Sequence, residues 1–163
     1  MKSTVQLATL ALVLGVVLQG CKEIASPCGP DLPARNPDRV TIPEGMWGDV
    51  WFWEGDFMPP CAKGTVSAVR REVRIHQLSS LSDVLGSGPF YRQVNTPLVA
   101  TTWSDEDGFF QAAVPAGIYS VFVVEDSLLY ANSFDGHMNI FPVKVDSDLV
   151  TPVLFNISYR ATY

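Results

Sequence analysis

The stretch that decides the fold runs from Ser104 to Glu125 and reads SDEDGFFQAAVPAGIYSVFVVE. It contains two apolar segments rich in β-branched and aromatic residues, Phe109–Val114 and Ile118–Glu125, each preceded by a compact turn. The turns consist of Asp, Gly and Pro, because Asp side chains hydrogen-bond to their own backbone and Gly supplies a positive φ. Two short strands with tight turns are typical of an all-β domain.

Short strands separated by turn residues continue on both sides of this stretch. We expect further strands at Trp47–Trp53, Val69–Leu78, Leu98–Trp103, Ile140–Val145 and Val150–Tyr159. The stretch Ser79–Val94 is expected to be a loop that could include a short helix, and Ala131–Gly136 is expected to turn. About seven short strands at this spacing predict a β-sandwich.

Apolar and polar residues alternate within Val69–Leu78, which predicts a strand with one dry and one wet face. The dry face holds Val73 and Ile75. The wet face comprises Arg70, Glu72, Arg74 and His76. We therefore expect His76 to be an ordinary surface residue, and the same holds for His137, which follows a turn glycine.

The N-terminus has the parts of a secretory signal in order. Lys2 is the positive region, and an apolar run from Leu7 to Leu18 follows; at about a dozen residues it is shorter than a membrane span. The junction Leu18-Gln19-Gly20-Cys21 resembles the lipobox of bacterial lipoproteins, which implies cleavage before Cys21 and a diacylglycerol on its thiol. Residues 1–20 are thus expected to be a lipoprotein signal peptide. The alternative is an ordinary secretory peptide with a chance cysteine.

A lipid on Cys21 predicts where the protein is found. Several acyl chains, such as palmitate, hold a protein firmly on a membrane, whereas a single chain binds reversibly. Because Lys22 rather than Asp follows the cysteine, we expect a cell-envelope protein on the outer membrane of a Gram-negative bacterium. The membrane, bound through Cys21, is the partner that the sequence predicts.

Residues 21–45 are expected to be a proline-rich tether, and residues 46–163 a single domain. The prolines that disfavour helix there are Pro27, Pro30, Pro33, Pro37 and Pro43. If Cys21 carries lipid, Cys28 and Cys61 remain, and an even pair in an exported chain suggests a disulfide. Two free thiols are the alternative.

The domain also resembles a known family. The residues that carry the resemblance are Thr102–Val124, Gly48–Trp51, Glu54–Pro59 and Ala131–Gly136. They are similar to the carboxypeptidase regulatory-like domain, a seven-stranded transthyretin-like (prealbumin-like) β-sandwich, and to a group of bacterial lipoproteins of that class. The resemblance implies a non-catalytic module, since the metal-binding His and Glu motifs of a carboxypeptidase are absent from this sequence.

Two groups of residues are candidate binding sites. Trp47, Trp51 and Trp53 are spaced by even numbers, so in a strand they share one face and could form an aromatic strip that stacks on sugar rings. The alternative is that the tether or the 79–94 loop covers them. Asp105 and Asp107 are weak calcium candidates, because carboxylates in a turn supply some of the six to eight oxygens that Ca²⁺ requires. The alternative there is a solvated turn.

Composition limits the classes of function. A formal net charge of −6 argues against nucleic acid as a partner. The sequence contains no Gly-x-Ser-x-Gly elbow and only two histidines, and no cofactor is expected. We therefore expect a non-catalytic, lipid-anchored binding module whose protein or glycan partner is not identified. The alternatives are a carbohydrate-binding module that uses the aromatic strip and, with less support, a small envelope hydrolase.

Overall fold

The structure is a computed structural model that describes residues 28–163. The predicted signal peptide, the lipidation site Cys21 and the first residues of the expected tether lie outside these residues. The described chain contains the strands β1 (Gly45–Asp56), β2 (Thr65–Ala68), β3 (Glu72–Gln77), β4 (Val84–Ser87), β5 (Phe90–Val94), β6 (Leu98–Trp103), β7 (Phe109–Ala112), β8 (Gly117–Glu125), β9 (Leu128–Tyr130), β10 (Pro142–Val145) and β11 (Val150–Thr162). Two short 3-10 helices, η1 (Pro37–Arg39) and η2 (Leu81–Asp83), complete it. The all-β prediction is thus confirmed for this part of the chain.

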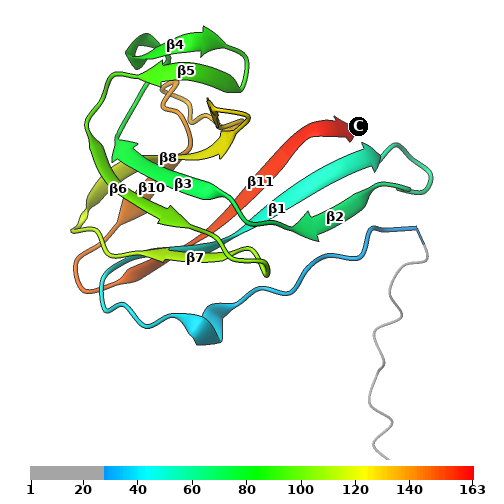
Figure 1. Cartoon of the computed structure of the whole chain (residues 1–163), viewed down its shortest axis with the longest axis horizontal. Coiled ribbons are helices and arrows are strands. Elements are labelled where there is room, and N and C mark those ends of the chain that lie inside the picture. Colours follow the sequence, from blue (N-terminus) through cyan, green and yellow to red (C-terminus); the bar gives the residue numbers. More distant parts are fainter. Residues whose placement is uncertain (1–27) are drawn as a thin grey trace, which may run out of the picture.

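The strands form two sheets (Figure 1). In the first sheet, β11 runs parallel to β1 along its length. On the other edge of β1, β7 pairs with its first part and β2 with its second part, both antiparallel. The second sheet has the order β4-β5-β9-β8-β3-β6, with β10 also paired to β8. Among residues 28–163, no helix is long and apolar enough to span a bilayer.

The hydrophobic core draws on both sheets. Its most buried members are Met46, Val50, Phe110, Phe155 and Ile157 from the first sheet and Val73, Ile75, Val121 and Val123 from the second. Gly48 lies among them on β1, where an added Cβ would approach the carbonyl oxygen of Val153 to 2.4 Å and the ring of Phe110 to 2.8 Å. The close approach of β1 to both neighbours therefore requires glycine at this position.

The stretch Ser104–Glu125 connects the two sheets. β6 ends in the second sheet, the turn Ser104–Gly108 reverses the chain, and β7 pairs with β1 in the first sheet. Asp105 Oδ1 accepts hydrogen bonds from the backbone N–H groups of Asp107 (3.0 Å) and Phe109 (3.1 Å), and Gly108 adopts a φ of 78°. β8 then returns to the second sheet, so the two predicted strands lie in different sheets.

The stretch Ser79–Val94 differs from the predicted loop. It contains the hairpin β4–β5, which extends the second sheet through β9, and η2 supplies the short helix. Gly86 permits the irregular register between the two strands, since it has a φ of 155° and stands where the pairing shifts. With β9 and β10 as further short strands, the described chain holds more strands than the seven expected.

The prediction that His76 faces water is wrong. Its side chain is only 6% exposed and packs edge-to-face on Phe122, with ring centroids 5.6 Å apart. Nδ1 lies 2.9 Å from the carbonyl oxygen of Thr96, which comes between β5 and β6. The alternating pattern places His76 on the same face as Arg74, but it does not reveal that residues far along the chain bury this one position. His137 is exposed, as expected.

Buried His76 predicts a pH-dependent stability. Burial lowers its pKa, whereas the same group in the unfolded chain has a pKa of about 6.5. Below that pH the unfolded state takes up the proton more readily, so the free energy of unfolding falls as the pH decreases towards the lowered folded pKa. Urea unfolding of the wild type should therefore lose more stability between about pH 7.5 and pH 5 than His76→Gln does. Parallel pH profiles for the two proteins would contradict this assignment.

Candidate functional site

Residues 28–44, called the strap below, lie along the face of the β1 sheet that is turned away from the second sheet (Figure 1). At its start, the carbonyl oxygen of Cys28 accepts a hydrogen bond from the backbone of Ala62 in the β1–β2 loop (3.1 Å). Near its end, Thr41 and Gln111 of β7 exchange two hydrogen bonds of 3.0 and 2.8 Å. The described part of the expected tether is therefore packed on the domain.

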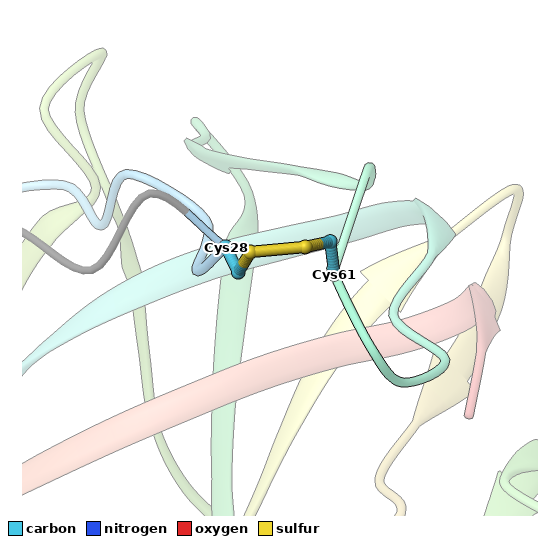
Figure 2. The surroundings of a disulfide bond; sticks show 2 residues. All are labelled: Cys28 and Cys61. Carbon is cyan, nitrogen blue, oxygen red and sulfur yellow. A yellow bond between two sulfur atoms is a disulfide. The ribbon is translucent and has the colours of Figure 1, made fainter.

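A disulfide fixes the start of the strap. Cys28 and Cys61 are bonded, with their Cα atoms 4.4 Å apart (Figure 2). The bond closes a loop between residues 33 positions apart. In the chain-entropy account such a closure stabilises the folded state by roughly 3–4 kcal/mol. Of the cysteines singled out in the sequence, these two are brought together in the described structure.

The centre of the strap is held by a buried carboxylate. Asp49 of β1 is fully buried, and its Oδ2 accepts a hydrogen bond from Arg35 Nε at 2.5 Å. Its Oδ1 accepts one from the Asn36 amide at 2.7 Å. Arg35 also donates to the carbonyl oxygen of Val153 on β11 at 3.2 Å. A buried carboxylate is costly without such partners, so the strap supplies what Asp49 needs.

The three tryptophans of β1 share one face, and that face is the one along which the strap lies. The guanidinium of Arg35 lies 5.3 Å from the ring centre of Trp47, and Trp51 is only 5% exposed. The indole N–H of Trp53 donates to Asn156 Oδ1 of β11 at 2.9 Å. The structure therefore shows Trp51 buried, whereas Trp47 and Trp53 are partly exposed.

The turn Ser104–Gly108, which carries Asp105 and Asp107, also binds the strap. Arg39 forms ion pairs with Asp105 and, at 3.5 Å, with Asp107, and its guanidinium lies 4.5 Å from the ring centre of Phe109. Although partial burial opposes the shift, hydrogen bonds from Arg39 and the backbone lower the pKa of Asp105. Within residues 28–163, no three or more His, Cys, Asp or Glu side chains are placed to hold a metal ion. The structure brings Asp105 and Asp107 to an arginine instead of to further calcium ligands.

A second buried polar cluster joins the two sheets. Glu125 of β8 is 5% exposed, pairs with Arg71 and accepts a hydrogen bond from the hydroxyl of Tyr159 on β11 at 2.8 Å. Burial, together with the hydrogen bond to Glu125, raises the pKa of Tyr159 to about 12. Both carboxylate oxygens thus have partners within the fold, as expected of a group that stabilises the sandwich.

Two of the clefts on the surface of residues 28–163 are further candidate features. One, of about 400 Å³, is lined by Gly86, Ser87, Phe90, Arg92 and Leu128, so Arg92 is its one charged lining residue. The other, of about 370 Å³, lies between β10 and β11. Neither cleft is lined by Asp49, Glu125 or the tryptophans of β1.

Sequence reasoning missed the most buried charge of the site. Asp49 was singled out only as part of a family resemblance, and nothing in the local pattern links it to Arg35 and Asn36. A usable signal was its position between Trp47 and Trp51, because an acidic residue on a face otherwise made of tryptophans needs a cationic partner if that face is covered.

Comparisons with known proteins give no relative. No protein-family model matches the chain, and neither the curated proteins nor the solved structures searched contain a significant match.

Removal of the Asp49 carboxylate is expected to free the strap. Asp49→Ala leaves Arg35 and Asn36 without their buried acceptor, and loss of one partner of such a pair should lower the free energy of unfolding by roughly 2–4 kcal/mol. In the folded variant, trypsin should cleave after Arg35 and Arg39 faster than in the wild type. The fragments can be resolved by mass spectrometry after reduction.

The matched control is Asp107→Ala, which removes an exposed partner of Arg39 and leaves Asp105 in place. It should change stability by no more than about 0.5 kcal/mol and leave the cleavage rate unchanged. Equal cleavage of the Asp49→Ala strap and the wild-type strap would show that the carboxylate does not hold the segment.

Proposed function

We propose that this chain is a non-catalytic β-sandwich module held in the cell envelope by a lipid on Cys21. The N-terminal order of Lys2, the apolar run Leu7–Leu18 and the junction Leu18-Gln19-Gly20-Cys21 supports the anchor. In the proposal, residues 1–20 are removed and the acylated cysteine becomes the first residue. The predicted address remains the outer membrane.

The observation that carries the proposal is the way the chain joins the domain. Only seven positions after Cys21, Cys28 is bonded to Cys61 in the β1–β2 loop. From there the strap is held by Asp49, Asp105 and Gln111. A lipid on Cys21 would therefore be attached through a short connection to a fixed point of the sandwich, an arrangement suited to displaying a domain at a membrane.

The buried ionisable groups support a role in binding rather than in catalysis. Asp49 is paired with Arg35, and Glu125 with Arg71 and Tyr159, so these groups are used within the fold. The resemblance to carboxypeptidase regulatory-like domains, with their transthyretin-like sandwich, agrees with such a module and is part of the proposal. The carbohydrate-binding alternative has less support, because Trp51 is only 5% exposed and so offers little of its ring for a sugar to stack on.

Metabolic labelling with an alkyne-bearing fatty acid tests the anchor. In a bacterial host that processes lipoproteins, the wild-type chain should incorporate the label and fractionate with membranes. Cys21→Ala should incorporate none and should be released from the membrane fraction, since its thiol is the attachment point.

The double variant Cys28→Ala/Cys61→Ala is the matched control, because it removes two other cysteines and keeps Cys21. It should be labelled as strongly as the wild type. Equal incorporation into the wild type and Cys21→Ala would overturn the lipid anchor.

A further inference from the structure

One end of the sandwich brings together three parts of the chain (Figure 1). These are the start of the strap at Cys28, the β1–β2 loop and the end of β11. The disulfide joins the first two, and the backbone N–H of Phe57 donates to the carbonyl oxygen of Thr162 at 2.8 Å, which joins the second to the third. Residues 57–63 together with Tyr163 are called the loop end below.

The loop end exposes apolar side chains next to an aromatic cluster. Met58 is 45% exposed and Tyr163 is 68% exposed, and the prolines at 59 and 60 are also exposed. Phe57 is packed between Trp53 and Tyr163, with ring centroids 5.1 and 5.7 Å away. The exposed groups are therefore presented by a stacked aromatic cluster that extends from β1.

The charges beside the loop end are already engaged with protein groups. Glu54 is paired with Arg160 at 3.3 Å, and Asp56 Oδ1 accepts a hydrogen bond from the backbone N–H of Met58 at 2.8 Å. Lys63 adds an exposed cation. This composition, apolar and aromatic groups with a cation close by, is the one that favours the interfacial zone of a bilayer.

Covalent geometry decides which end of the domain can meet the membrane. Seven Cα–Cα steps separate Cys21 from Cys28, so even a fully extended chain spans no more than about 25 Å. Because the disulfide holds Cys28 at the loop end, that end must stay within this distance of an anchor on Cys21. Leu149 precedes the opposite end of β11, and the 14 residue steps to Tyr163 correspond to about 46 Å of extended strand.

We propose that the loop end lies on the surface of the bilayer that holds the anchor, with Met58 and Tyr163 at the level of the lipid headgroups. This inference rests on the lipid anchor proposed above. A small apolar surface is sufficient, because a short connection gives the tethered domain an effective concentration in the millimolar range at the bilayer. The domain would then stand with the long axis of β11 directed away from the membrane.

Site-specific fluorescence in the full-length lipidated protein tests the orientation. Met58→Cys places an environment-sensitive fluorophore on the loop end. Its matched control Leu149→Cys places it on an exposed apolar position just before the opposite end of β11. The other cysteines are blocked by lipid or by the disulfide. In vesicles of phosphatidylethanolamine and phosphatidylglycerol, a headgroup-linked nitroxide should quench the label at 58 by about two-fold or more and leave the label at 149 unchanged. Equal quenching at both positions would overturn the orientation.

A longer segment between Cys21 and Cys28 shows whether the loop end binds the bilayer or is only kept near it by the short connection. A Gly-Ser insertion of about 20 residues between Ser26 and Pro27 adds a root-mean-square reach of roughly 25 Å. If the loop end binds the bilayer, the quenching at 58 should persist in the lengthened protein. A label at Tyr163→Cys in the lengthened protein should also be quenched, and adding Met58→Glu should abolish that quenching. Loss of quenching on lengthening alone would refute docking.

The mass of the purified protein shows whether Cys21 carries lipid, and this measurement does not depend on the quenching at position 58. A lipidated protein whose label at 58 is not quenched refutes the docking surface and leaves the anchor in place. A protein without lipid on Cys21 refutes the anchor, and the inference that rests on it fails as well.

Discussion

The contact between the buried Asp49 carboxylate of β1 and the strap is the interaction on which the rest of the arrangement depends. The inner face of β1 packs in the core, where Gly48 lets the neighbouring strands approach. The outer face carries tryptophans and one fully buried acid. Since a buried carboxylate needs charged or hydrogen-bonding partners, the sheet is complete only with Arg35 and Asn36 in place.

The strap therefore belongs to the folded body and is attached to it at separate points. The disulfide attaches it at the β1–β2 loop, and Arg39 attaches it at the turn where the chain crosses between the sheets. That turn uses Asp105 twice, because one carboxylate oxygen caps the backbone and the other receives the guanidinium. The result is that residue 28, where the chain continues towards Cys21, has a fixed place on the domain. Because residue 28 is fixed on the domain, a lipid on Cys21 would also limit how the domain can be oriented at the membrane, which is what the two proposals state.

Local sequence patterns were sufficient for the all-β class, for the turn Ser104–Gly108 and for the shared face of the β1 tryptophans, because each depends on neighbours a few positions apart. They failed where a distant segment decides the environment. His76 follows the period of its strand and is still buried, since it packs on Phe122 and contacts the carbonyl oxygen of Thr96. The pairing of Arg39 with Asp105 spans 66 positions, so no local pattern contains it. The β4–β5 hairpin was missed because its glycines are equally common in loops.

Hydrogen–deuterium exchange of the strap amides tests most directly whether the strap is part of the folded body. The backbone N–H groups of Arg39 and Val40 bond within the strap turn, and that of Thr41 donates to the Gln111 side chain on β7. If the strap completes the sheet, these amides should exchange far more slowly than in an unstructured peptide and should lose their protection in Asp49→Ala. Exchange at the unprotected rate in the wild type, while the amides of β1 remain protected, would contradict the account.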